Sequence, residues 1–183
     1  MAIATSIDLS NEQTRIRSKL GFEPQRHTSA PLRTVTTIPV AGSVEAALEV
    51  MFDFDRLVSY LAGMRRVETE YDAQGKPTVR HCTVTGLGRF AEEIVWYDEA
   101  HGYAYSAIPA PGLPVKDQLG VMTVQADADA SVIRWEQYFN WTGLLKPLVM
   151  KFMLPNMFKS VGKGLQRDLG VAGKIEFRWA EFE

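Results

Sequence analysis

Residues 143–169, GLLKPLVMKFMLPNMFKSVGKGLQRDL, form the longest helix-compatible run in the chain. From Met157 onward, apolar side chains recur on one face at about 100° per residue and basic side chains recur on another. The upstream half is apolar on nearly all sides, interrupted only by Lys146 and Lys151. Its apolar face is out of phase with the downstream one, and Pro155 lies between them, where a proline removes a backbone donor. We therefore predict a long C-terminal helix that is kinked or broken near Pro155.

The chain upstream of this helix alternates apolar and polar residues in short runs that are typical of strands. Turn-prone segments rich in Gly, Pro, Asp and Ala separate the runs. The predicted strands are 64–71, 78–85, 89–97, 102–108, 115–125 and 132–141. Because the links are short, we expect an antiparallel meander. In the last of these strands Glu136 and Tyr138 fall on the face that we expect to be wet.

A β-branched strand at 34–40 and two short helices, 44–51 and 56–62, precede the meander. This order predicts an α+β helix-grip fold, with a curved antiparallel sheet of about seven strands around the C-terminal helix. We expect three regions. Residues 1–33 are an N-terminal extension with a short helix and an arm, 34–169 are the ligand-binding domain, and 170–183 are a tail that adds a strand in one interpretation.

The composition argues against several classes of protein. A formal net charge of -2 with both signs interspersed gives no basic stripe for nucleic acid. The single cysteine, Cys82, has no partner or metal-ligand spacing, so we predict neither a metal nor a cofactor. No signal peptide and no integral membrane span are expected, which makes the cytoplasm the predicted location. A homodimer is left open.

Four segments in this order resemble the START/Bet v 1-like (SRPBCC) superfamily, and within it polyketide cyclase/dehydrase-type proteins. They are SVEAALEVMFDFDRLVSYLAGM, GRFAEEIVWYDEAHGYAYSAI, PGLPVKDQLGVMTV and SVIRWEQYF. The resemblance implies a deep cavity between the concave sheet face and the C-terminal helix, entered near the short helices and the strand-connecting loops. Its members include aromatases, cyclases, ligand carriers and receptors.

Glu92 is the principal catalytic candidate. It shares a strand face with bulky Phe90, Ile94 and Trp96, a face that we assign to the interior. An acid in such a setting favours its neutral form unless it is paired, which suits proton transfer. The alternative phase turns Ala91, Val95 and Tyr97 inward and leaves Glu92 in solvent. The resemblance supports the interior assignment, because the family often carries an acid here.

Other candidates share apolar faces of the sheet or the helix. Tyr105 is the second catalytic candidate, since its hydroxyl could bond a carbonyl or phenol. The predicted ligand-binding residues are Phe90, Trp96, Tyr103, Gln118, Met122, Gln137, Met150, Met153 and Met157. Flexible methionines and aromatic rings are typical of a pocket for a hydrophobic or aromatic ligand, although the same residues could simply pack a core.

Two functions remain open, together with a weaker third. The chain could promote cyclisation, aromatisation or dehydration of a reactive intermediate in biosynthesis, as a lyase-like enzyme. It departs from the known aromatic cyclases, whose Trp- and Arg-rich signature is replaced here by VRHCTVTGLGRF. It could instead be a noncatalytic carrier or sensor of a lipid-like or aromatic ligand. The third is a protein-interaction module that uses its arm and tail.

Overall fold

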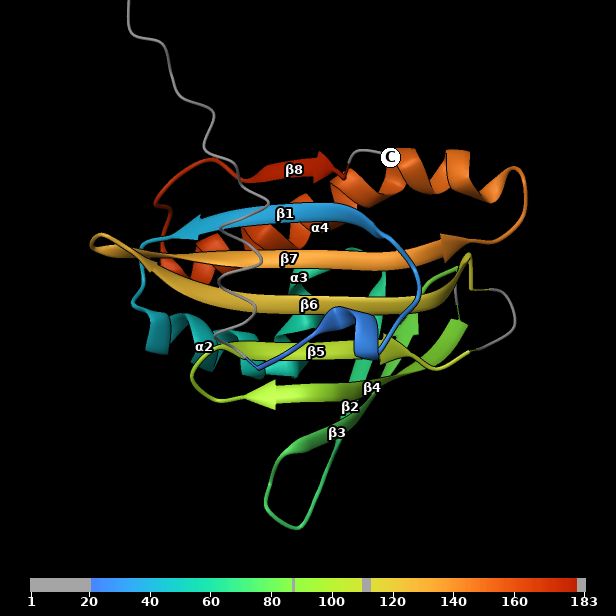
Figure 1. Ribbon diagram of the computed structural model, residues 1–183. Coiled ribbons are helices and arrows are strands. Elements are labelled where there is room, and N and C mark those ends of the chain that lie inside the picture. The colour runs from blue at the N-terminus through green and yellow to red at the C-terminus, as the bar shows by residue number, and fades with distance from the viewer. Residues whose placement is uncertain (1–20, 87, 110–112, 181–183) are drawn as a thin grey trace, which may run out of the picture.

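The computed structural model describes residues 21–86, 88–109 and 113–180, and within them eight strands form one antiparallel sheet (Figure 1). The strand order is β2-β3-β4-β5-β6-β7-β1-β8. The strands are β1 (Leu32–Val40), β2 (Met64–Tyr71), β3 (Pro77–Val84), β4 (Gly88–Asp98), β5 (Gly102–Ala107), β6 (Val115–Asp127), β7 (Ala130–Trp141) and β8 (Glu176–Trp179). The helices are η1 (Pro24–Arg26), α2 (Val44–Phe52), η2 (Phe54–Arg56), α3 (Leu57–Tyr60) and α4 (Lys146–Leu169). The short helix predicted near 12–20 lies outside the described residues.

The predicted meander is confirmed. Strands β2 to β7 pair in sequence order, because each link is too short to allow a crossover. The first strand, β1, closes the arrangement by pairing with β7, and β8 then pairs with the free edge of β1. Between β1 and the meander, Ser43 caps α2 by accepting a hydrogen bond from the Ala46 backbone N–H.

Of the kink or break predicted at Pro155, the break is wrong, since α4 runs without interruption from Lys146 to Leu169 with Pro155 inside it. A proline in a helix interior deprives the carbonyl four residues earlier of its partner. That carbonyl belongs to Lys151, an exposed residue, so water can hydrate the group. The helix therefore continues at the cost of one backbone hydrogen bond.

The larger core lies between α4 and what we call the inner face of the sheet. Ile38 of β1, Trp135 of β7 and Phe158 of α4 belong to it, together with residues of α2 and α3. The Trp135 and Phe158 rings meet edge to face, with centroids 4.5 Å apart. This packing fixes the helix over the β7-β1-β8 end of the sheet and defines the interior in which a site can form.

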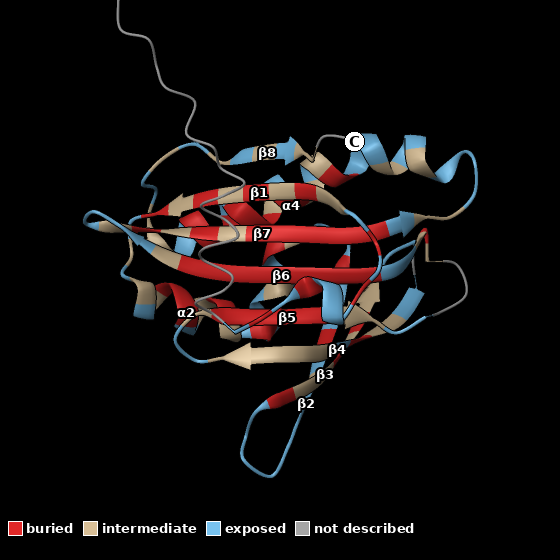
Figure 2. Ribbon diagram, in the orientation of Figure 1, coloured by how far each residue is buried: buried red, intermediate tan, exposed pale blue. Residues whose placement is uncertain are grey.

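A second, smaller core covers the opposite, outer face. Phe22 and Ala30 of the segment before β1 pack there on residues of β5, β6 and β7, and Thr28 and Ser29 hydrogen-bond to Asp117 of β6. Tyr138 and Glu136 are buried rather than wet, which corrects the prediction for that face of β7. Because both faces are covered, β5, β6 and β7 are buried along most of their length (Figure 2).

Candidate ligand-binding site

The β3–β4 hairpin places Arg80 directly opposite Glu92, and both side chains enter the interior. The Arg80 Nε and Nη2 atoms donate to Glu92 Oε2 at 2.8 and 2.6 Å. The side chains are only 4% and 11% exposed, so the pair is almost withdrawn from water. The inward orientation predicted for Glu92 is therefore observed, but its environment is ionic rather than purely apolar.

Arg80 was missed by the sequence analysis, although a signal for it exists. Arg80 and Glu92 are equally far from Gly86 in sequence, and residues at equal distances from the centre of a hairpin are cross-strand partners. An arginine opposite an interior glutamate is the partner that a buried carboxylate requires. VRHCTVTGLGRF was interpreted as lacking the cyclase signature, yet it supplies an interior arginine.

Aromatic rings surround the Arg80 guanidinium. Its carbon lies 4.7 Å from the ring centroid of Tyr105, 5.0 Å from that of Phe54 and 5.9 Å from that of Tyr103. Burial alone would lower the pKa of Arg80, but the Glu92 carboxylate outweighs burial and raises that pKa above its usual value. The guanidinium is therefore a permanent positive charge in an aromatic cage.

Hydrogen bonds from neighbouring side chains hold the Tyr105 hydroxyl. Trp135 Nε1 and Gln137 Nε2 both donate to the Tyr105 oxygen, at 3.0 and 2.6 Å. Gln118 Nε2 donates to Gln137 Oε1 at 2.8 Å, and Gln118 Oε1 accepts from the Ala107 backbone N–H. Burial, reinforced by the Glu92 charge, raises the pKa of Tyr105 well above its usual value. The phenol stays protonated, and its proton points away from the two donors.

Gly120 makes room for this arrangement. It lies opposite Tyr105 in the β5–β6 register, and an added Cβ would come within 2.2 Å of Tyr105 Cζ. Any larger residue at this position would displace the ring on which Arg80 rests.

One donor in the cluster has no partner. In the described part of the chain, Arg80 Nη1 is buried without a hydrogen bond. An unpaired N–H on a buried charged group is costly, and such exceptions in native proteins call for an explanation. The unpaired Nη1 and the Tyr105 hydroxyl both belong to the cluster in which the guanidinium packs on the Tyr105 ring.

Most of the other predicted residues of the sheet also belong to the inner face. Tyr103 is buried, and its hydroxyl donates to the sulfur of Met122, its register partner, at 3.1 Å. Phe90 is half-buried against the same core.

Cys82 also faces this core. Burial, followed by the Glu92 charge, raises its thiol pKa to about 12, so the thiol stays protonated.

The inward orientation predicted for Trp96 is wrong. A β-bulge between Ile94 and Trp96 changes the alternation of β4, so Trp96 pairs with Ala104 on the outer face. Its ring stacks on Phe22 at 4.9 Å. The prediction assumed strict alternation along β4, which holds up to Ile94 but not at Trp96.

The three predicted helix methionines separate. Met150 and Met157 are partly buried against the inner core, whereas Met153 is 56% exposed. Met153 therefore cannot line an interior pocket in this structure.

A surface pocket of about 440 Å³ lies at the short-helix end of the molecule. Val44, Leu48 and Phe52 of α2 form its apolar side, and Glu45, Glu49, Glu99 and Ala100 complete the lining. The Phe52 ring lies 4.7 Å from that of Tyr97 and 6.2 Å from that of Tyr103, measured between centroids. Phe52 thus stands between the pocket and the rings around Arg80.

The described residues contain no group of His, Cys, Asp and Glu side chains arranged to hold a metal. None of the helices in the described ranges is long and apolar enough to cross a membrane.

Comparison with solved structures shows the fold. A START superfamily protein from Mycobacterium smegmatis matches with a TM-score of 0.62 and 15% identity, over 75% of this chain and 96% of that one. XoxI from Bacillus cereus matches with a TM-score of 0.62 and 20% identity, over 76% and 96%. The Zhui aromatase/cyclase from Streptomyces sp. R1128 matches with a TM-score of 0.54 and 17% identity, over 75% and 96%. The fold is the helix-grip fold of the START/Bet v 1 superfamily, as predicted.

The sequence profile of one family, described as polyketide cyclase / dehydrase and lipid transport, matches residues 31–169. This match covers most of the chain, and the chain belongs to that family. No curated protein matches it.

Proposed function

We propose that the chain binds a largely apolar, aromatic small molecule that carries a carbonyl, phenol or carboxylate oxygen. The observation that carries the proposal is the unpaired Arg80 Nη1, buried beside the Tyr105 phenol and walled by aromatic rings. A ligand oxygen would accept from Nη1 and from the Tyr105 hydroxyl, while its rings would replace contacts among Phe54, Tyr103 and Met122.

Entry would take place at the pocket beside α2. Phe52 lines the pocket and lies against the ring of Tyr103, so rotation of this one side chain would open a path from the pocket to the rings around Arg80. Glu92 then acts as the counter-charge that orients Arg80, in place of the free acid expected from the sequence. The family description, which includes lipid transport, supports the binding function.

Catalysis of cyclisation, aromatisation or dehydration is the second candidate. It is favoured by the way Tyr105 is held, because two N–H groups fix its oxygen and leave its proton for another acceptor. A protonated phenol next to a guanidinium could stabilise the oxyanion that develops on a carbonyl oxygen. The family description names cyclases and dehydrases, in agreement with this role.

The binding proposal is tested with two dyes that share an apolar aromatic body. One is 8-anilinonaphthalene-1-sulfonate, which carries an anionic oxygen group, and the other is N-phenyl-1-naphthylamine, which does not. The native chain should bind the sulfonate dye more tightly, because only this dye can use Arg80 Nη1. Tyr105→Phe should weaken sulfonate binding by roughly 2- to 10-fold, and Tyr97→Phe serves as the control. Dye fluorescence that appears only on partial unfolding would contradict the proposal.

Turnover separates the two candidates. In the catalytic case, Tyr105→Phe should lower kcat on a linear polycarbonyl substrate by about 10²-fold, which is more than its effect on binding. Glu92→Gln should then lower kcat as well, because a neutral amide at this position holds the Arg80 guanidinium less firmly than the carboxylate does. If the native chain binds the substrate but does not turn it over, only the carrier function remains.

A further inference from the structure

The first half of α4 presents an apolar surface to solvent. Leu145 and Phe152 are 77% and 71% exposed, and Leu144, in the turn before the helix, is 97% exposed. Leu148, Val149 and Met153 are each more than half exposed. Contiguous apolar patches of this kind are uncommon on soluble proteins and mark interaction sites.

These residues form one outward stripe. At 100° per residue, Leu148, Val149 and Phe152 lie on the side of the helix opposite buried Leu154 and Phe158. The first half of the helix is thus apolar on its outward side as well as toward the core. Core packing explains the inward side only.

Positive charges accompany the stripe without any acid. Between Trp141 and Arg167 the sequence contains no Asp or Glu, although the whole chain carries a net charge of -2. Exposed Lys146 and Lys151 flank the stripe, and exposed Lys159 and Lys163 continue its outward line along the second half of the helix. Within the described ranges, these four lysines form no ion pair.

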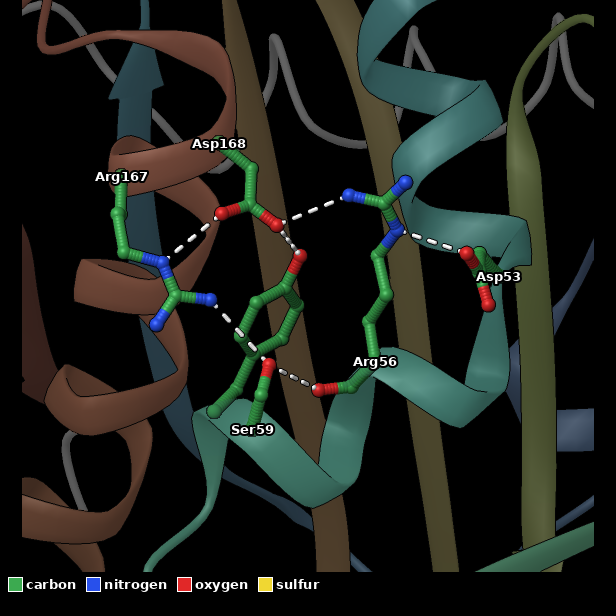
Figure 3. Close-up of polar contacts among 6 residues, drawn as sticks. Asp53, Arg56, Ser59, Arg167 and Asp168 are labelled. Atoms are coloured by element: carbon green, nitrogen blue, oxygen red, sulfur yellow. Dashed lines mark hydrogen bonds and ion pairs between the residues drawn. The ribbon is translucent and has the colours of Figure 1, made fainter.

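The other end of the same helix is firmly attached. Asp168 Oδ2 accepts from the Tyr60 hydroxyl at 2.6 Å and pairs with Arg56 Nη1 at 3.0 Å (Figure 3). Arg167 bonds Asp168 Oδ1 and Ser59 Oγ, and these contacts tie α4 to the α3 region. Figure 2 shows the contrast, with the start of α4 mostly pale blue. The exposed half therefore projects from a fixed base.

We propose that the first half of α4 docks on the surface of an anionic lipid bilayer. The stripe Leu145, Leu148, Val149, Phe152 and Met153 enters the boundary between headgroups and acyl chains, and the four lysines contact anionic headgroups. An apolar face flanked by lysines is the pattern of an interfacial helix. A protein partner would also need an acidic surface to match the lysines. A bilayer, unlike a protein, needs no shape complementarity to the flexible Leu, Phe and Met side chains of the stripe.

Co-sedimentation of the full chain with lipid vesicles tests this proposal. Binding to vesicles of phosphatidylcholine mixed with phosphatidylglycerol should be at least about tenfold tighter than binding to phosphatidylcholine alone, and should weaken with added salt. The double variant Leu148→Ser/Phe152→Ser should lose binding at least about tenfold, and Lys151→Glu/Lys159→Glu should lose the preference for anionic lipid. Tyr71→Ser, which changes a comparably exposed side chain on β2, should leave binding unchanged.

Three results would overturn the proposal. The first is no binding to anionic vesicles, or equal binding by the native chain and the Leu148→Ser/Phe152→Ser variant when both unfold at the same temperature. The second is a native dimer in sedimentation that this double variant abolishes, which would assign the stripe to a second copy of the chain. The third is vesicle binding that appears only after removal of residues 1–20, which would assign the stripe to that segment. The Tyr105→Phe change in the dye assay leaves the stripe intact, and Leu148→Ser/Phe152→Ser leaves Tyr105 intact, so either proposal can fail alone.

Discussion

Arg80 and Glu92 are each tolerated in the interior only because the other is there. Replacing Arg80 by Met keeps most of the side-chain volume but leaves a buried carboxylate without its partner. We expect Arg80→Met to destabilise the fold by about 3–5 kcal/mol, the usual cost of breaking a buried pair. Urea unfolding monitored by tryptophan fluorescence gives the free energy of unfolding that this comparison needs.

The matched control removes both charges. Arg80→Met/Glu92→Leu should recover most of the lost stability, because an apolar pair of similar volume replaces a buried ion pair at little or no cost. If the single and double variants are equally unstable, the loss arises from the rings around Arg80 rather than from the ion pair.

At the scale of the element, the unbroken course of α4 reverses an expectation about Pro155. In a broken helix, Pro155→Ala would force one apolar face out of place and destabilise the fold. In the continuous helix, Ala restores the hydrogen bond to the Lys151 carbonyl and has a far higher helix propensity. We expect a gain of about 1–3 kcal/mol in the free energy of unfolding. A loss of stability in urea titration would show that the helix needs the proline.

The contact between α3 and α4 should make stability depend on pH. Hydrogen bonding from Tyr60, followed by Arg167 and Arg56, lowers the pKa of Asp168 from 3.8 to about 2. A lowered folded-state pKa favours the carboxylate, so its contribution is present above about pH 4 and is lost as the pH falls toward 2. In acid titrations followed by circular dichroism, Asp168→Asn should be less stable than the native chain at pH 6 and approach it near pH 2. Asp129→Asn, in the β6–β7 turn, should show no such convergence.

Over the whole molecule, the architecture was predictable because it depends on local pattern. Alternation and turn residues located the strands from Met64 to Trp141, and short links dictated their antiparallel order. Glu92 was placed inward for the same reason. The β4 bulge before Trp96 left no comparable signal, since one extra residue reverses the alternation without changing composition.

The remaining errors concern contacts between segments far apart in sequence. Tyr138 is buried because Phe22 and Ala30 lie over the outer face, and alternation within β7 contains no information about a cover supplied from elsewhere. Met153 was taken for a pocket residue because it is apolar, and composition does not show whether an apolar helix residue is covered by the sheet or exposed to solvent. Arg80 could have been found by hairpin register.

The pairing of β1 with β7 has a consequence for the order of folding during synthesis. The hairpins from β2 to β7 can close one after another, because each strand meets its partner as soon as it has been made. β1 is made first, but its β7 partner Trp135 lies about a hundred residues later along the chain and its β8 partners later still, so both edges of β1 stay open while the rest is synthesised. α4, which covers the same interior, is also made after β7. The nascent chain therefore spends most of its synthesis with its inner apolar face uncovered, and this is the interval in which it depends most on protection from aggregation.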